Sequence, residues 1–386
     1  MRLFHLSDLH IGIKLYNHDL REVQEELFAQ ITDYVRQYQP DAILIAGDIY
    51  DKAVPSAEAV QLFDSFLESL CDAADKAEIM IISGNHDSAQ RIDYLNFLLA
   101  KQRVHMVGIP PRTPGESIEK VALDDEYGTV NFYLLPFCKP SVIRGTFDES
   151  DTANNTYSYN DALHRLFARE NVNEKERNVL VSHQFYLPPG KKVEEIERME
   201  SEITAVGNVD VVASDVLAPF EYAALGHIHK PMTVGEDRFR YCGTPFAYSV
   251  SEANQEKGLL MIALGRKGEE PEITKLPLVP RRKVIVIEDT FENVLKQASE
   301  DYVQIILTDD KDLEIFDVQE RIAMAFPNRL EIQRKYVRQK GISGEMAEPV
   351  CTSPYELICQ FIPDMDEEEQ DIMKSVINEA LGGAAE

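Results

Sequence analysis

The chain has 386 residues, 44% of them hydrophobic, which is more than one ordinary domain needs, so we expect a main domain with additions. Its formal net charge of −28 argues against a protein that holds nucleic acid through a basic face of its own. Five scattered cysteines without a CxxC pair argue against a disulfide framework and against a thiolate zinc site. Because no apolar run approaches the roughly 18 residues that span a bilayer, we predict no membrane contact and a cytoplasmic location.

Strands and helices alternate in the first hundred residues, and each strand ends in polar residues. The expected strands are 3–6, 42–46 and 79–82, and the expected helices are 19–38, 56–70 and 88–100. Ser56 is the expected N-cap of the second helix. This order predicts parallel strands joined by right-handed crossovers. Ligands bind at the carboxyl ends of such strands, so three polar strand ends should meet at one edge of the sheet.

The middle of the chain changes to shorter strands, several of which end in histidines. The expected elements are an exposed loop at 148–160, a helix at 161–168, and strands at 132–135, 179–181, 222–225, 239–241 and 259–264. His183 follows one of these strands, and His227 and His229 follow another. Residues 190–202 between them are rich in charge.

Beyond an expected linker at 277–280, the chain predicts a compact β-α-β-α-β unit. Its strands are 284–287, 303–307 and 330–332, and its helices are 291–298 and 318–325. A second linker is expected at 339–349, followed by two amphipathic helices over 353–381. We therefore divide the chain into a main domain at 1–276, a small domain at 281–340 and terminal helices at 350–386.

Paired polar residues at the strand ends predict a metal site. Asp8 and His10 are two residues apart at the end of a strand and can project to the same face, as can His227 and His229. Carboxylate, imidazole and amide ligands without thiolates favour manganese, with magnesium or iron as alternatives, over structural zinc. Asp48 is the natural carboxylate to bridge two such ions.

Five short motifs taken together resemble the calcineurin-like metallophosphoesterases. They are Asp8-x-His10, Gly47-Asp48-x-x-Asp51, Gly84-Asn85-His86-Asp87, His183 and Gly226-His227-x-His229. The run Tyr241-Cys242-Gly243-Thr244-Pro245 and the carboxyl-terminal third narrow the resemblance to the SbcD family of nuclease subunits. The resemblance covers essentially the whole chain. It implies an α/β fold with a β-sandwich flanked by helices, a small α/β capping domain and C-terminal helices.

The resemblance also implies roles for individual residues, carried over position by position. One divalent ion would be held by Asp8, His10, Asp48 and His229, and a second by Asp48, Asn85, His183 and His227. His86 would then be free to stabilise the transition state or to protonate the leaving 3' oxygen, and Asp87 would orient it. Some relatives have a histidine three residues after the bridging aspartate, whereas this chain has Asp51.

The same resemblance implies DNA and protein partners. The capping domain would contact DNA through basic residues, and those expected are Arg281, Arg282, Lys283, Arg334, Lys335 and Arg338. The terminal helices would bind an SbcC-type, SMC-like ATPase, and the apolar residues Leu95, Leu98 and Leu99 would support a homodimer within a heterotetramer. The implied activity is hydrolysis of DNA, as a double-strand exonuclease and a single-strand or hairpin endonuclease in replication, repair and recombination near the nucleoid.

Two other functions fit the sequence. The first is a metallophosphoesterase for small phosphodiesters or phosphoproteins, which would leave the small domain and the terminal helices unexplained. The second is a non-catalytic scaffold on the same fold, which would have no need of His86. The charge of −28 suits either alternative better than a nuclease acting alone.

Overall fold

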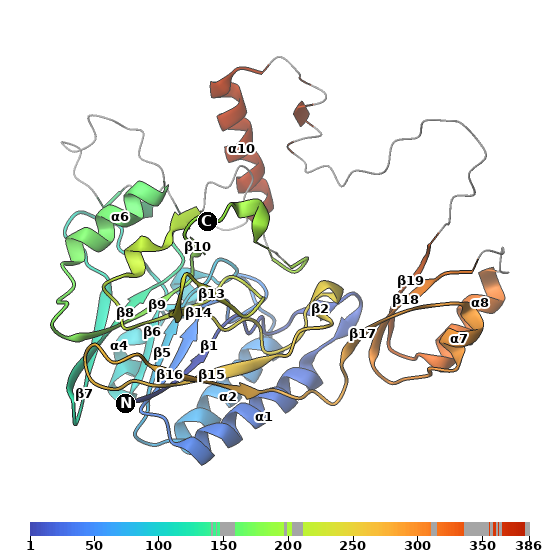
Figure 1. Cartoon of the computed structure of the whole chain (residues 1–386), viewed down its shortest axis with the longest axis horizontal. Helices are drawn as coiled ribbons and strands as arrows, with labels where there is room; N and C mark the ends of the chain where they lie inside the picture. Colours follow the sequence, from blue (N-terminus) through green and yellow to red (C-terminus); the bar gives the residue numbers. More distant parts are fainter. Residues whose placement is uncertain are drawn as a thin grey trace.

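The computed structural model is built around two six-stranded sheets that lie face to face (Figure 1). It describes residues 1–139, 142–143, 145–146, 159–196, 199–202, 211–309, 315–335, 355, 358–359, 362 and 365–382. Of the sequence predictions, the loop at 148–160 before its last two residues, the linker at 339–349 and Arg338 lie outside these residues.

The first sheet carries the predicted N-terminal strands. Its order is β16 (Glu272–Pro277), β15 (Gly258–Ala263), β1 (Arg2–Leu6), β4 (Ala42–Ala46), β5 (Glu78–Ile82) and β6 (Val104–Val107). The four strands β1, β4, β5 and β6 run parallel, as expected, and β15 and β16 add an antiparallel edge. The sequence prediction missed β16, which occupies residues just before the expected linker and pairs with β15 along its whole length.

The second sheet comes from the middle of the chain. Its order is β13 (Met232–Val234), β14 (Glu236–Tyr241), β12 (Tyr222–Leu225), β9 (Arg177–Ser182), β8 (Gly128–Leu135) and β7 (Glu119–Asp125). The four central strands, β14, β12, β9 and β8, run parallel, while β13 and β7 are antiparallel edges. A short parallel pair, β10 (Phe185–Leu187) and β11 (Val211–Ala213), stands beside this sheet.

Three apolar layers hold the main domain together. Between the sheets, residues such as Leu44 and Met80 of the first pack with Phe132 and Val181 of the second. The outer face of the first sheet is covered by α1 (Arg21–Tyr38) and α2 (Ala57–Ala73), and that of the second by α6 (Tyr159–Glu170) (Figure 1). The predicted β-sandwich flanked by helices is therefore confirmed.

The long helices follow the sequence pattern closely. In α1, Val23, Leu27, Ile31 and Val35 recur every four residues and are buried against the first sheet. The predicted cap of α2 is confirmed, because the Ser56 hydroxyl oxygen accepts a hydrogen bond from the backbone N–H of Ala59. The sequence pattern thus places both helices within a few residues of their observed bounds.

The helix predicted over residues 88–100 is wrong as a single element. The structure has two one-turn helices, α3 (Ala89–Ile92) and α4 (Asn96–Leu99), followed by a short 3-10 turn at Ala100–Gln102. Between them, Leu95 adopts a left-handed backbone conformation with φ of 62°, which interrupts the helical hydrogen bonds. As a result Tyr94, Phe97 and Leu98 are turned outward, with 71%, 70% and 53% of their surface exposed.

The small unit near the carboxyl end has the predicted β-α-β-α-β order. Its elements are β17 (Val284–Asp289), α7 (Phe291–Leu295), β18 (Tyr302–Leu307), α8 (Ile315–Ala325) and β19 (Arg329–Arg334). The three strands are parallel, and a separate apolar core that includes Val294, Ile305 and Phe326 lies under them. In Figure 1 this unit stands at the end of the sandwich next to α1.

A short hairpin near the amino end contacts the small unit. It consists of β2 (Lys14–Leu15) and β3 (His18–Asp19), which directly follow the first metal motif. The His18 imidazole contacts the carbonyl oxygen of Arg329 at 3.1 Å and packs edge-on against the ring of Tyr302. Contacts made by a loop of the main domain therefore reach two strands of the small unit.

The carboxyl-terminal region contains α10 (Glu367–Gly382), which corresponds to the second predicted terminal helix. Ile372 and Val376 on this helix are 59% and 54% exposed. Most of the first terminal helix falls outside the described residues. Among the helices that the structure does describe, none combines the length and the apolar composition needed to cross a bilayer.

Candidate metal centre

The polar strand ends of both sheets meet at one end of the sandwich. Asp8 and Asp48 follow β1 and β4 of the first sheet, and His183 and His227 follow β9 and β12 of the second. The backbone N–H of Asp8 donates to the carbonyl of Gly47 at 3.0 Å, and that of His227 donates to Asp8 Oδ1 at 3.0 Å. Hydrogen bonds thus connect ligand-bearing loops across the interface between the two sheets.

One group of expected ligands gathers around His10 and His229. Their Nε2 atoms are only 3.1 Å apart, and an oxygen of Asp8 completes a set of three ligand atoms that all lie within 4.8 Å of one another. His10 and His229 are almost wholly buried. Two imidazole nitrogens that face each other beside a buried carboxylate are suited to share one cation.

A second group gathers around Asn85. Its Oδ1 lies 3.1 Å from His183 Nε2 and 2.8 Å from His227 Nδ1. Asp48 Oδ2 is 3.2 Å from His183 Nε2 and 3.7 Å from His10 Nε2. One carboxylate oxygen of Asp48 therefore lies between the two groups, and the structure brings all seven expected ligands together.

Backbone carbonyls orient two of the histidines. The Nδ1 atom of His183 lies 2.7 Å from the carbonyl oxygen of Ala46, and Nδ1 of His86 lies 2.9 Å from that of Asp51. A carbonyl oxygen can only accept, so each Nδ1 carries the hydrogen and each Nε2 remains available toward the centre. The ring of His86 lies 4.7 Å from that of His10.

Asp87 does not contact His86 in the expected way, because the hydrogen of His86 Nδ1 is donated to the Asp51 carbonyl instead. The Asp87 carboxylate accepts three backbone N–H groups, from Gly84, Ile49 and Tyr50, at 2.9 to 3.0 Å. It therefore ties the loop after β5 to the loop after β4, which are the two loops that carry Asn85 and Asp48.

Burial and neighbouring charges oppose each other at the centre. Burial alone would raise the pKa of Asp48, but the nearby His183 holds it well below its usual value. Burial would lower the pKa of His183, but the Asp48 carboxylate raises it to about 9. Asp8 and Asp48 expose at most 2% of their surface. Two buried carboxylates among imidazoles and an amide form a donor set that fits divalent cations.

The backbone around these ligands is held in unusual conformations. Asp8, His10, Asp48 and His227 have φ angles of 53°, 42°, 51° and 97°, in the left-handed region that side chains rarely adopt. Gly84 is required for a different reason, since a Cβ there would lie 2.1 Å from Asp48 Oδ1. Strained backbone of this kind is concentrated at functional sites.

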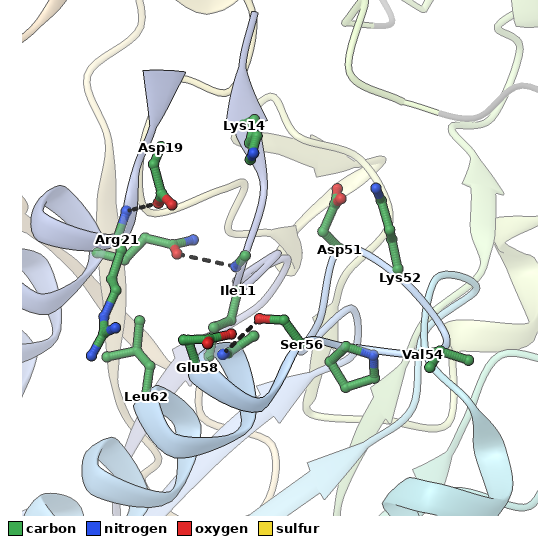
Figure 2. A pocket seen from close by; sticks show the side chains of 14 residues that line it. Ile11, Lys14, Asp19, Arg21, Asp51, Lys52, Val54, Ser56, Glu58 and Leu62 are labelled. Atoms are coloured by element: carbon green, nitrogen blue, oxygen red, sulfur yellow. Dashed lines mark hydrogen bonds between the residues drawn. The ribbon is translucent and has the colours of Figure 1, made fainter. Parts of the chain in front are cut away.

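A cavity of about 480 Å³ is lined by Ile11, which follows His10, and by the Asp51 loop (Figure 2). Its walls come from the hairpin and the start of α1, from the loop with Asp51 and Lys52, and from the start of α2. None of the seven expected ligands lines it. The cavity therefore borders the site through Asp51, whose carbonyl holds His86.

Comparison with known proteins assigns the family. The model of the calcineurin-like phosphoesterases matches residues 1–231, which include all seven expected ligands. The SbcD subunit of the nuclease SbcCD from Staphylococcus epidermidis is 30% identical over 77% of this chain and 75% of that protein. The chain belongs to the calcineurin-like phosphoesterases, in the SbcD family. The family predicted from the sequence motifs is thus confirmed.

A second curated relative agrees with this family. The SbcD subunit of the nuclease SbcCD from Staphylococcus saprophyticus is 29% identical over 78% of this chain and 75% of that protein. A solved dimetal phosphatase from Danio rerio aligns with a TM-score of 0.38 and 11% identity over 72% of this chain and 97% of that one. By its family and its SbcD relatives, this phosphoesterase is a hydrolase of phosphodiester bonds, and the family implies divalent metal ions.

The phosphoesterase contains functional candidates that the sequence did not reveal. Ser201 and Glu252 form a hydrogen-bonded chain behind His229, and Glu202 accepts a hydrogen bond from its backbone N–H at 2.9 Å. Nothing in the residue types marks them, because serine and glutamate in a charged stretch are typical of a solvated surface. Thr244, which donates a hydrogen bond to Glu252 Oε2, lies inside the run Tyr241–Pro245 that narrowed the family.

The basic residues expected to contact DNA lie in or beside the small unit of the phosphoesterase. Arg282 approaches Glu22 of α1 at 3.8 Å, and Lys335 forms a 2.5 Å ion pair with Glu288 of β17. The side chains of Arg281 and Lys283 are exposed, while Arg334 is half-buried. Part of the expected positive charge is thus neutralised within the chain.

Proposed function

We propose that this phosphoesterase is a two-metal DNA nuclease, an exonuclease on double-stranded ends and an endonuclease on single strands and hairpins. The observation that carries the proposal is the position of Asp48 Oδ2 between two groups of ligands, 3.2 Å from His183 and 3.7 Å from His10. Its relatives are named as subunits of the nuclease SbcCD, which supports DNA as the substrate class and roles in DNA end processing, repair and recombination.

The proposed ligand sets share Asp48. Asp8, His10 and His229 would complete one set, and Asn85, His183 and His227 the other. Manganese suits these oxygen and nitrogen donors best. When bound, the ions would neutralise phosphate charge and lower the pKa of a coordinated water. They would also supply the attraction for DNA that a chain of net charge −28 lacks.

His86 is the proposed acid of the reaction. Its Nδ1–H is fixed on the Asp51 carbonyl, so the imidazole presents Nε2 toward the centre, beside His10. A histidine placed in this way can protonate the leaving 3' oxygen or stabilise the charge that develops on the phosphate. Asp87 contributes indirectly, by holding the Gly84 loop against the Asp48 loop.

The surfaces of the chain suit the proposed partners. Of the residues expected at a homodimer, Leu95 and Leu98 are exposed, whereas Leu99 packs against the core of the first sheet. With the outward-facing Tyr94 and Phe97, Leu98 forms an apolar patch of the kind that protein interfaces cover, and a homodimer would bury it. The exposed Ile372 and Val376 of α10 would pack on an SbcC-type ATPase. The small unit would cap the centre and contact DNA, and the complex would act in the cytoplasm at the nucleoid.

Cleavage of a labelled duplex and a labelled hairpin tests the function. With manganese, the purified chain should cut both, and EDTA should abolish cutting. The His86→Ser variant should lose at least a hundredfold in rate, about the lower end of what a general acid contributes. It should still bind manganese, because His86 is outside both proposed ligand sets.

Two results would contradict the proposal. An active His86→Ser variant would contradict the role assigned to the histidine. DNA cleavage that persists without metal would contradict the two-metal mechanism. The strongly acidic composition favours one rival, a phosphoesterase for small phosphodiesters. Rapid turnover of such a compound, together with no DNA cleavage, would identify that rival as correct.

A further inference from the structure

Residues 199–202, in the loop before β11, contact both His229 and the segment around Glu252. Met199 Sδ accepts a hydrogen bond from the Gln255 side chain at 2.9 Å, and the backbone N–H of Glu200 donates to Ser251 Oγ at 3.1 Å. Ser201 Oγ lies 2.7 Å from His229 Nδ1, and Glu202 Oε1 accepts the backbone N–H of His229. Residues 199–202 therefore bridge from the segment around Glu252 to this one histidine.

The hydrogen bonds of Ser201 determine which nitrogen of His229 carries a hydrogen. The single hydroxyl hydrogen of Ser201 is donated to Glu252 Oε1 at 2.6 Å, because a carboxylate can only accept. Ser201 Oγ must then accept from His229 Nδ1, which keeps its hydrogen. The Nε2 atom of His229 is left to face His10 Nε2, 3.1 Å away.

The chain of hydrogen bonds from His229 through Ser201 ends at Glu252, whose carboxylate is held by further contacts. It is fully buried, and its Oε2 accepts from Lys257 Nζ at 2.6 Å and from the Thr244 hydroxyl at 2.9 Å. Lys257 also donates to the backbone carbonyl of His229 at 3.2 Å. A charged pair thus holds the imidazole through Ser201 and the backbone through Lys257.

We propose that Ser201 and Glu252 are positioning residues of the metal centre, which fix the imidazole of His229 so that Nε2 alone is presented to the ion. This inference rests on the proposed metal function. Partners of this kind orient a metal-binding histidine and raise its affinity for metal, and their loss typically weakens metal binding about 10- to 100-fold.

A purely structural role for the network predicts something different. A buried Glu252–Lys257 pair that only supports the fold would change thermal stability when broken, yet leave the metal affinity of the folded protein unchanged. Ser201→Ala separates the two roles, because it removes one hydroxyl and leaves the pair of Glu252 and Lys257 intact.

The test is manganese binding to the full chain, followed by the electron paramagnetic resonance signal of free Mn²⁺ at one fixed pH. Ser201→Ala should weaken binding of one ion about tenfold, and Glu252→Gln by up to about 100-fold. Ser201→Thr keeps the hydroxyl and should restore wild-type affinity. The matched control is Glu256→Gln, which removes a carboxylate that is 94% exposed four residues away and should have no effect.

A second readout reports on the ring itself. In ¹⁵N spectra of the metal-free chain, His229 should carry its hydrogen on Nδ1, and Ser201→Ala should alter that assignment, whereas Glu256→Gln should not. Unchanged manganese affinity in both Ser201→Ala and Glu252→Gln would overturn the inference while leaving the proposed nuclease intact. A wild-type chain that binds no manganese would overturn the proposed function and this inference with it.

Discussion

Buried histidines in this protein differ according to what their ring nitrogens contact. His5 is fully buried in β1, and its Nδ1 pairs with the Tyr222 hydroxyl at 2.8 Å, away from the metal centre. Burial lowers the pKa of His5 to about 3. His183, beside Asp48, has a raised pKa instead. Burial without a charged partner therefore lowers the pKa of one histidine, while a neighbouring carboxylate raises the pKa of another.

The low pKa of His5 predicts acid sensitivity. Its pKa of about 3 in the folded protein lies below the ordinary histidine value of 6.5, so the unfolded chain takes up a proton first and stability falls as the pH drops from 6.5 to 3. At pH 5 this loss is about 2 kcal/mol relative to pH 8. In His5→Asn, whose side-chain oxygen can still accept from Tyr222, that loss should disappear.

Urea unfolding of the metal-free protein at pH 8 and pH 5 measures this difference. Other groups titrate in the same range, so the wild-type change is compared with the change in His5→Asn. Equal losses on acidification in the two proteins would contradict the assigned cause.

Gly84 offers a second test at a single residue. In Gly84→Ala the new methyl group would meet Asp48 Oδ1 at 2.1 Å and Asp48 N at 2.4 Å, so the proposed bridging carboxylate must move. We expect a loss of about 1–3 kcal/mol in unfolding free energy, and roughly tenfold weaker manganese binding, measured by denaturation and by metal titration.

Gly115→Ala is the matched control. Gly115 has φ of +91° but nothing within 4 Å of an added Cβ, so the change costs about 1–2 kcal/mol of backbone strain and leaves metal binding unchanged. Normal manganese affinity in Gly84→Ala would show that the Asp48 carboxylate tolerates displacement.

At the candidate site, the residues that were predictable from the sequence are those that follow strand ends. The positions of Asp8, Asp48 and His183 at the sheet edge were predictable because each comes within two residues of the end of an apolar strand. The partner of His86 was not, since a backbone carbonyl leaves no mark in the sequence. Ser201 and Glu252 were equally hidden, because their contact with His229 depends on loops folding back over distances of 28 and 23 residues along the chain.

At the scale of elements, the break between α3 and α4 has the clearest consequence. A continuous amphipathic helix over 88–100 would turn its apolar residues inward. The left-handed Leu95 instead turns Tyr94, Phe97 and Leu98 to the surface. Periodicity predicted the helical residues but not the interruption, since leucine is an unusual residue for that backbone conformation.

The exposed patch on α4 predicts self-association. The wild-type chain should elute as a dimer at micromolar concentration, and Phe97→Glu should shift it to the monomer mass in size-exclusion chromatography with light scattering. Val60→Glu on α2 is the control, since Val60 is a single valine that is 45% exposed. A monomeric wild-type chain, or a dimeric Phe97→Glu variant, would contradict the prediction.

For the whole molecule, metal binding should stabilise the fold. An ion that binds only the folded chain raises the unfolding free energy by about 2.7 kcal/mol at 100 times its dissociation constant. Manganese should therefore raise the melting temperature, and EDTA should reverse the change. Asp48→Asn should show little response, because Asp48 contributes to both proposed ligand sets. An equal rise in the wild-type and Asp48→Asn proteins would place the ions elsewhere.

The overall architecture was largely predictable, for reasons that differ between its parts. The parallel strands β1, β4 and β5 and the helices between them follow from short-range periodicity. The prediction that two sheets stack into a sandwich came from the family resemblance, because the apolar pattern of a strand does not specify which sheet packs against it. The edge strand β16 was not predicted, because four of its six residues are exposed and its burial does not alternate.

The joining of the two sheets at the metal centre also bears on how the protein is made. The Asp8 side chain accepts a hydrogen bond from the backbone of His227, 219 residues later in the chain. A growing chain on the ribosome that has reached residue 135 holds Asp8, His10, Asp48 and Asn85 but none of the three later histidines. The two proposed ions can be bound together only after synthesis has passed His229, so a nascent chain shorter than this lacks part of the proposed metal centre.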